Sequence, residues 1–320
     1  MNKFQKHSSN IEEVIIDNPK TAQELRWINI INAGKKEVDY LKRRFHFNIE
    51  HLKASIATVF SQRPMISNED GYIFVIMHFP ILVNGKIIAG EIEFFLSHGY
   101  LVTAHNNNIP SLRNYWNIAR NKQEKLVTYS NESSVILLYE LLNSLIKDCY
   151  TLIDKNNIEI NSIEEAIFSG NQKEAVSQIL TLRMNIINLR RILINHSDII
   201  KRLSELKSSF IPHEEIKSQY DRLAEHSDKI WQMLHNQKDM IEVLNNTNES
   251  LLNDRMNDIM KTLTIFSVIV FPLSLMAGIF GMNAKYMPFI DDRYGFWIIL
   301  GLMGIFSLGM LLFFEKKKWL

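Results

Sequence analysis

The sequence predicts an α+β cytosolic domain with an antiparallel sheet, followed by a long stalk helix and a transmembrane hairpin of two helices. Two segments, 263–280 and 296–314, contain no charged residue, and at 1.5 Å per residue each approaches the ~30 Å hydrocarbon core of a bilayer. Upstream, stretches rich in β-branched and aromatic residues alternate with turn signals. From Asn131 onward, apolar residues recur at three- and four-residue spacing, which is typical of helices.

Residues 1–130 are predicted to be an α/β domain. Helical spacing is found in 21–31 and 35–60. The dipeptide Asn84-Gly85 suits the positive φ angles of a two-residue hairpin turn, so the stretches on either side of it are expected to pair as antiparallel strands. Three strands are expected, at 72–83, 86–97 and 100–105.

Residues 131–211 are predicted to be a helical layer. Its end is marked by Ile211-Pro212, because proline fits the first turn of a helix and the residue before it avoids helical geometry. A break is expected at Ser169-Gly170-Asn171. The expected helices cover 135–153, 158–166 and 175–206.

Residues 212–262 are predicted to be a stalk helix that continues into the first span, because no helix breaker follows until Pro272. The alternative is one long amphipathic helix in a bundle, but the unbroken helical register across 256–263 favours the stalk. Apolar residues spaced eleven apart allow nearly straight packing or a right-handed supercoil of neighbouring helices. They are Ile230, Ile241, Leu252 and Leu263.

The charged flanks of the two spans predict how the chain is oriented in a membrane. Lysine and arginine near span ends favour the cytoplasm. Basic residues precede the first span and fill the tail 315–320, whereas the loop 281–295 balances its basic residues with Asp291 and Asp292. Both termini are therefore expected in the cytosol and the loop outside. The polar N-terminus predicts no cleavable signal peptide.

Composition and motifs argue against several other classes. A net charge of +1 implies no nucleic-acid partner. The single cysteine, Cys149, allows no internal disulfide and is expected in the core. The ten histidines are scattered, and no phosphate loop, dinucleotide motif or HExxH motif occurs. We therefore expect neither an enzyme nor a resident cofactor.

A set of residues around the first span, here called the span stripe, shares one side of the predicted helix, because its members are spaced alternately three and four apart. Within the span, polar or small side chains dominate it. The span stripe consists of Asn257, Met260, Thr264, Ser267, Phe271, Ser274 and Gly278. Two interpretations are compatible: the stripe lines a pore, or its small residues serve close helix packing.

The outer end of the first span carries a motif. Gly281-Met282-Asn283 stands there, and Tyr286-Met287-Pro288 follows in the loop. With this placement between two terminal spans, about the last 65 residues resemble the CorA family of magnesium and cobalt transporters. The resemblance implies a homopentameric channel in a bacterial inner membrane, whose first spans surround a pore for divalent cations.

The chemistry of the spans predicts how such an ion would pass. Neither span contains a carboxylate or an imidazole, so nothing there can replace the inner water shell of Mg²⁺, which sheds its water reluctantly. We therefore expect a hydrated ion, held through its water shell by Gly281 carbonyls and Asn283 carboxamides. Together with Met282 these residues would form the selectivity filter.

The inner half of the pore would combine one polar contact with apolar narrowing. Asn257, at the cytosolic end, would repeat the amide contact with the hydrated ion. Met260, Leu263 and Phe271 would form constrictions that close the pore by excluding water. The divalent ion is then the transported substrate.

The chain departs from the magnesium-sensing members of the family. Those place an aspartate shortly before a Gln-Arg-Pro segment, facing an aspartate on the stalk of the next subunit. Here Ser55 and Ile56 precede Gln62-Arg63-Pro64, and Arg222 occupies the stalk position. Weak inhibition by intracellular Mg²⁺ is therefore expected. The remaining regulatory candidates on the stalk are Asp221, Glu225 and Asp228.

The outer loop departs as well, with Ala284 after the tripeptide and Phe289 after Met-Pro. The choice of Mg²⁺ over cobalt, nickel or zinc therefore stays open, and the zinc-transporting branch of the superfamily is an alternative. From a different class, a membrane-anchored coiled-coil scaffold would explain the stalk and the spans but not the polar stripe. A tethered enzyme is disfavoured because no catalytic constellation is present.

Overall fold

The computed structural model describes residues 3–17, 24–56, 63–121, 133–205, 214–282, 288, 293–317 and 319. The chain divides into two compact units, residues 1–244 and 245–320. The boundary falls inside helix α8 (Glu214–Phe280), which contributes to both units. Each unit is described by itself.

Within the described residues of the first unit, seven strands form one sheet in the order β1-β2-β3-β7-β6-β5-β4. Neighbouring strands are antiparallel except β3 and β7, which are parallel. The strands are β1 (Lys3–Lys6), β2 (Ile11–Asp17), β3 (Glu24–Ile31), β4 (Met65–Glu69), β5 (Tyr72–Val83), β6 (Lys86–Ser97) and β7 (Tyr100–His105).

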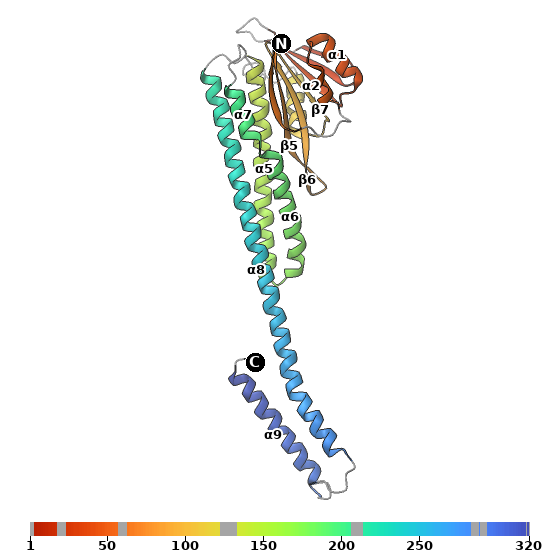
Figure 1. Cartoon of the computed structure of the whole chain (residues 1–320), viewed down its shortest axis with the longest axis vertical. Helices are drawn as coiled ribbons and strands as arrows, with labels where there is room; N and C mark the ends of the chain where they lie inside the picture. Colours follow the sequence, from red (N-terminus) through yellow and green to blue (C-terminus); the bar gives the residue numbers. More distant parts are fainter. Residues whose placement is uncertain are drawn as a thin grey trace. The chain divides into compact units, whose positions relative to one another are not determined.

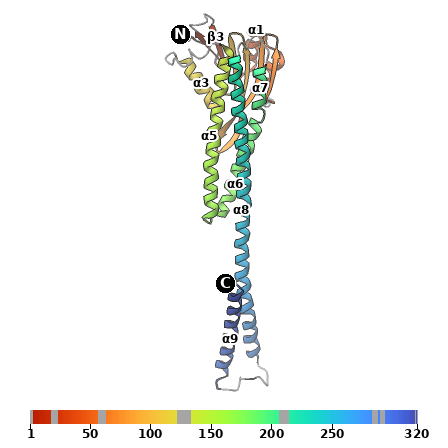
Figure 2. The same ribbon diagram turned by 90° about the vertical axis from the view of Figure 1, so that its left-hand side faces the viewer.

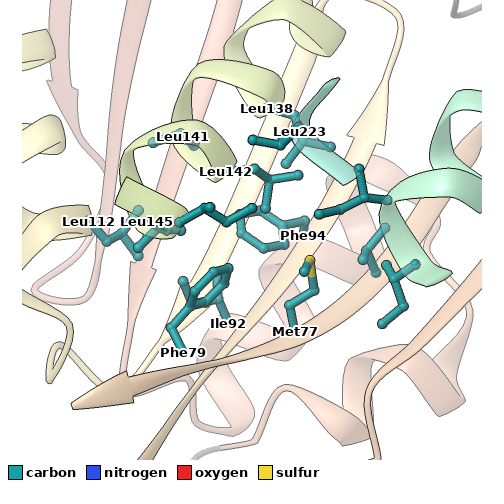
Figure 3. Packing of buried hydrophobic residues seen from close by; sticks show 14 of the residues in the cluster. Met77, Phe79, Ile92, Phe94, Leu112, Leu138, Leu141, Leu142, Leu145 and Leu223 are labelled. Atoms are coloured by element: carbon teal, nitrogen blue, oxygen red, sulfur yellow. The ribbon is translucent and has the colours of Figure 1, made fainter. Parts of the chain in front are cut away.

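Helices cover both faces of the sheet, with α1 and α2 on one side and α5 to α8 on the other (Figure 1). The apolar side chains of β5 and β6 that point to the second side meet leucines of α3, α5 and α8 (Figure 3). The remaining helices of this unit are α1 (Lys35–Phe45), α2 (Ile49–Ala54), α3 (Pro110–Arg120), α5 (Ser134–Phe168), α6 (Gln172–Leu193) and α7 (His196–Glu205).

The predicted β-hairpin is confirmed. Strands β5 and β6 have the predicted bounds, and Asn84 and Gly85 between them have φ angles of 50° and 77°. The third predicted strand, β7, is confirmed as well. Asn185 of α6 holds the hairpin: its Oδ1 accepts from Ile87 N at 3.1 Å and its Nδ2 donates to Gly85 O at 2.9 Å. This tie joins the hairpin to the helical layer.

The prediction of a helix over 21–31 is wrong, because residues 24–31 form strand β3 and the three before them lie outside the described residues. Leu25 and Trp27 face the core toward α5, whereas Ile28 and Ile30 face the core toward α1. A strand that is buried on both faces shows no alternation of polar and apolar residues. Strands β1, β2 and β4 were not predicted.

The single helical stretch predicted over 35–60 is also wrong, since two short helices occupy its described part. His46 adopts a left-handed conformation with φ 58° and ends α1. Asn48 then starts α2, because its side chain accepts a hydrogen bond from Glu50 N at 3.0 Å. Residues 57–60 lie outside the described residues.

The helical layer differs from the prediction at two points. The stretches 135–153 and 158–166 are joined in one helix, α5 (Ser134–Phe168). Helix α5 ends at Phe168 and α6 begins at Gln172, so the predicted break is confirmed. The continuous helix predicted over 175–206 instead divides at Ile194 and Asn195, and Leu206 and Ile211-Pro212 lie outside the described residues.

Buried polar contacts fix the positions of the helices. His196, which is buried, contacts the carbonyl of His78 on β5 through Nε2 at 2.7 Å. Gln237 of α8 donates to Ile153 O at 2.8 Å and accepts from Asn156 Nδ2 at 3.1 Å. These bonds hold α8 alongside α5 in the first unit (Figure 2). An amide pair that satisfies itself between two helices selects one register of their packing.

Cys149 lies in the core as predicted. Its side chain is 1% exposed on α5, and its Sγ lies 3.5 Å from Leu145 O. Burial raises the pKa of this thiol to about 12.

The second unit contains the rest of α8 and α9 (Gly295–Lys316). Each carries an 18-residue apolar window long enough to cross a bilayer, and almost none of either window is buried inside the chain. The apolar repeat on α8 is buried at Ile230 and Ile241 but exposed at Leu263. These spans therefore expose apolar surface that lipid or other copies must cover.

Candidate functional site

All seven residues of the span stripe lie on α8, which remains helical through Pro272 to Phe280. The buried residue of this span is Ile265, at 7% exposure, and Ile269, Pro272 and Met276 on the same side are half-buried. At about 100° per residue, the stripe lies on the opposite side of the helix from this face. Its bulkiest member, Phe271, is 72% exposed.

Two hydroxyl groups of the stripe are oriented by the backbone. Thr264 Oγ1 donates to Met260 O at 2.7 Å, and Ser267 Oγ donates to Leu263 O at 2.8 Å. Because each hydroxyl hydrogen is used inside the helix, the oxygen lone pairs remain as acceptors. The stripe thus offers acceptors to the bound waters of a cation, without a charge that would strip those waters.

The outer end of the stripe is described only in part. After α8 ends, Gly281 N donates to Ala277 O at 2.9 Å and Met282 N donates to Ile279 O at 3.2 Å. A side chain at Gly281 would place its Cβ 3.0 Å from Ala277 O, so this tight turn favours glycine. Pro288 lies in an exposed turn. Three predicted residues lie outside the described residues: Asn283, Tyr286 and Met287.

The inner end of the stripe opens on a cavity of about 580 Å³. Asn257, Met260 and Thr264 line it together with Asp254 and Trp319. The aspartate was not predicted as a site residue, although it lies three residues before Asn257 and therefore near the same side of the helix. Asp258 and Lys261, which form an ion pair at 3.3 Å, line the cavity as well.

The predicted regulatory carboxylates on α8 are engaged within the first unit. Asp221 accepts a hydrogen bond from Ser204 Oγ at 2.9 Å, and Asp228 pairs with Lys201 Nζ at 3.0 Å. Partial burial acts to raise the pKa of Asp228, but the Lys201 ammonium and hydrogen bonding outweigh it, so this pKa lies below its usual value. Glu225 is exposed.

The residues at the positions of the aspartate pair of magnesium-sensing members offer no ligand to a metal ion. Ser55 is buried and donates to His51 O at 3.3 Å, and Ile56 packs against the core on the α1 side. Arg222 is exposed, and its Nε donates a hydrogen bond to Ser218 O at 3.4 Å. Among the described residues, no three histidine, cysteine or acidic side chains are arranged to hold a metal ion.

Comparison with known protein families identifies the family to which the chain belongs. A family model described as CorA-like Mg²⁺ transporter protein matches residues 22–317. The chain belongs to the CorA family. It is accordingly a membrane protein that transports divalent cations, and not an enzyme.

Individual relatives span most of this CorA chain. The Bacillus subtilis protein named "Putative metal ion transporter YfjQ" is 28% identical over 293 residues, 92% of this chain and 89% of that protein. The cobalt/magnesium transport protein CorA of Thermotoga maritima is 31% identical over 184 residues, 58% of this chain and 52% of that protein.

A solved structure confirms the predicted fold. The complete CorA magnesium transporter from Methanocaldococcus jannaschii matches with a TM-score of 0.83 at 20% identity, covering 96% of this chain and 98% of that one. The sheet domain, the long helix and the two terminal helices therefore form the CorA architecture.

Proposed function

We propose that this CorA-family chain forms a homopentameric channel in a bacterial inner membrane, through which Mg²⁺ enters the cytosol. The supporting observation is the span stripe, whose acceptor oxygens lie on the side of α8 opposite the face of Ile265. One helix cannot enclose a pore, so several copies must contribute their stripes. Both termini face the cytosol in this arrangement.

The selectivity filter in this proposal is the ring of Gly281, Met282 and Asn283. Its carbonyl and carboxamide oxygens accept hydrogen bonds from the waters bound to the ion, so Mg²⁺ keeps its inner shell. Asn257 repeats the contact at the inner end. Met260, Leu263 and Phe271 form the apolar narrowing that closes when water leaves it.

Transport needs no chemical energy source in this proposal. A membrane potential of ~100 mV contributes about 2.3 kcal/mol per charge, hence roughly 4.6 kcal/mol for a divalent ion moving inward. This corresponds to an accumulation of over a thousandfold. An open channel would overfill the cell, so closure is the controlled step.

The test is ion uptake into proteoliposomes that contain the purified chain and carry an inside-negative potential. Potential-dependent Mg²⁺ uptake is expected, and competition by Co²⁺, Ni²⁺ and Zn²⁺ measures the preference. Uptake that prefers Zn²⁺ would mean that Zn²⁺, and not Mg²⁺, is the substrate. No uptake of any of these ions by an intact oligomer would instead favour a membrane scaffold.

Asn283→Ala probes the filter in the same assay. Removal of the carboxamide ring should lower uptake to the background of empty liposomes, while the oligomer stays assembled by light scattering. Asn245→Ala, on the part of α8 upstream of the span, is the matched control and should transport normally. Wild-type uptake by Asn283→Ala would refute the role of the ring.

A further inference from the structure

A cavity of about 550 Å³ opens in the first unit, where β6, α6 and the residues that lead into β4 meet. Its volume lies within the range of roughly 300–1,000 Å³ that is usual for small-molecule sites. The span stripe belongs to the second unit, so ion transport does not account for this cavity. It is here called the hairpin cavity, and its lining includes Arg63, Pro64, Ile88, Asn188, Arg191 and Asn195.

Two arginines give the hairpin cavity its positive charge. Arg63 precedes β4 and Arg191 lies in the last turn of α6, and both are exposed. Within the part of the chain that the structure describes, neither guanidinium has an ion-pair partner, and no aspartate or glutamate lines the cavity. A guanidinium stays protonated and presents a planar fork of N–H donors, which matches the oxygens of a phosphate group. The pair of arginines therefore favours an anion with several oxygens.

The other titratable side chain of the lining is engaged within the sheet. His78 is buried on β5, and its Nε2 lies 2.7 Å from Oε2 of Glu91 on β6. The two arginines are therefore the groups that would meet a charged ligand. A metal cation is disfavoured, because like charges repel and no lining carboxylate offsets the guanidinium groups.

Helix α6 adds amide groups beside the arginine. Asn188, Arg191 and Asn195 are spaced three and four apart, which places them on one side of the helix and its continuation. Asn188 is held in place, because its Nδ2 donates to Ile87 O at 3.2 Å. Its Oδ1 is left as an acceptor, and the exposed Asn195 offers both a donor and an acceptor. These groups suit the hydroxyls of a sugar, which inorganic phosphate lacks.

The hairpin cavity also has an apolar wall. Ile88 lines it and is 44% exposed, beside the half-buried Pro64. Small-molecule sites typically combine such a wall with a few polar groups that fix the orientation of the ligand. A small inorganic anion would leave this wall in water, whereas a ligand with a flat ring would cover it.

We propose that the hairpin cavity binds a soluble phosphorylated small molecule of nucleotide size. Arg63 and Arg191 hold its phosphate, Asn188 and Asn195 bond its sugar hydroxyls, and its ring lies on Ile88 and Pro64. A ligand in this position joins the segment before β4 to α6. The site goes beyond the proposed channel function, and binding to it does not require transport.

The phosphate contacts are tested by calorimetry on the full-length chain in detergent, with adenosine diphosphate as the probe and no divalent ion present. The wild type should bind it at least tenfold more tightly than it binds adenosine. Arg63→Ala and Arg191→Ala should each weaken binding about tenfold, which is the loss of roughly one charge-assisted contact. Arg183→Ala, at an exposed arginine of α6 outside the lining, is the matched control and should bind normally.

Absence of binding to the wild type, or equal binding by Arg191→Ala and Arg183→Ala, would overturn the site. Micelles that contain phosphatidylglycerol should not displace the probe. Displacement by them would assign the cavity to a lipid headgroup and refute a soluble ligand. Each of these results leaves the channel standing, because none of them measures ion uptake.

The apolar wall is tested at Ile88, whose exposure allows substitution without opening the core. Ile88→Ser should weaken adenosine diphosphate several-fold and leave the weaker binding of inorganic phosphate unchanged. Val83→Ser, at a similarly exposed position of the same hairpin outside the lining, should bind both like the wild type. Inorganic phosphate that binds the wild type as tightly as adenosine diphosphate would refute a ligand of nucleotide size.

Discussion

Thr264 and Ser267 both direct their hydroxyl hydrogens into the backbone of α8, to carbonyls four residues earlier. A hydroxyl held in this way acts toward the outside as an acceptor only. Acceptors suit the waters around a cation and offer nothing to an anion. At this scale the sequence spacing was sufficient to predict the stripe, because helical geometry alone decides which residues share a side.

The apolar narrowing beside these hydroxyls can be tested at Leu263. Leu263→Asn places a polar side chain where exclusion of water is expected to close the pore, so resting leak of divalent ions should rise several-fold. The resting leak is measured as the flux of divalent ions into proteoliposomes without an applied potential. Phe266→Asn is the control, since Phe266 is similarly exposed but lies away from the stripe. Equal leak in both variants would argue against a gate at Leu263.

Two buried histidines predict how stability depends on pH. Burial lowers the pKa of His196 and of His105 to about 4 each, below the ordinary value near 6.5. The unfolded chain therefore binds these protons first, and stability is lost as pH falls from about 6.5 toward 4.

For His196 this loss should be about 2 kcal/mol between pH 7 and pH 5. The free energy of unfolding is measured by denaturant unfolding of the detergent-solubilised chain at both pH values. In the variant His196→Gln, its decrease from pH 7 to pH 5 should be smaller than in the wild type by this amount. His98→Gln, at an exposed turn, should keep the wild-type difference. An unchanged pH dependence in His196→Gln would mean that the imidazole is not held neutral in the fold.

At the scale of elements, the hairpin of β5 and β6 depends on α6 through side-chain amides. Asn185 supplies both an acceptor to Ile87 N and a donor to Gly85 O, and Asn188 Nδ2 donates to Ile87 O at 3.2 Å. This stretch of β6 lies beyond the part that pairs with β7, so the helix takes the place of a missing strand partner. The hairpin and the helical layer should therefore move together.

Asn185→Ala removes two of these bonds and leaves the Ile87 amide without its acceptor. The expected cost is roughly 1–3 kcal/mol of local stability, and hydrogen exchange at residues 85–89 should accelerate tenfold or more. Thr181→Ala, which removes a hydroxyl bonded only within α6, is the control. Slow exchange retained in Asn185→Ala would show that the hairpin is held by its apolar contacts alone.

The elements that the sequence predicted share a local signal, and those it missed lack one. Asn84-Gly85 fixes a turn by its own backbone preference, so β5 and β6 were correct in their bounds. Strand β3 is stabilised by pairing with β2 and β7 and by burial on both faces of the sheet. A local sequence pattern contains no information about these partners. The division at Ile194 lies beside His196, which contacts β5, a partner far away in sequence. The filter residue Asn283 was predicted from its motif and lies outside the described residues.

At the scale of the whole molecule, the prediction of weak inhibition by intracellular Mg²⁺ depends on the carboxylates of α8. Asp221 and Asp228 already hold Ser204 and Lys201, and Ile56 cannot coordinate an ion. A divalent ion would have to displace these partners to bind there. The ligand set left for a regulatory Mg²⁺ is therefore poor.

Millimolar Mg²⁺ should accordingly protect the N-terminal part of the assembled protein from protease less than twofold. The rate of limited proteolysis with and without Mg²⁺ measures this, and Asp221→Ala should behave like the wild type. Strong protection that is lost in Asp221→Ala would show that a sensor exists at a shifted position.

The burial of Cys149 has a consequence for the chemistry that the cell can direct at this transporter. With a pKa of about 12, only about one thiol in 10⁵ is ionised at neutral pH, and the side chain is closed to solvent. Peroxide, disulfide reagents and nitrosating agents all need an accessible thiolate. Ion entry through this chain should therefore lack the thiol switch that an exposed cysteine would provide during oxidative stress.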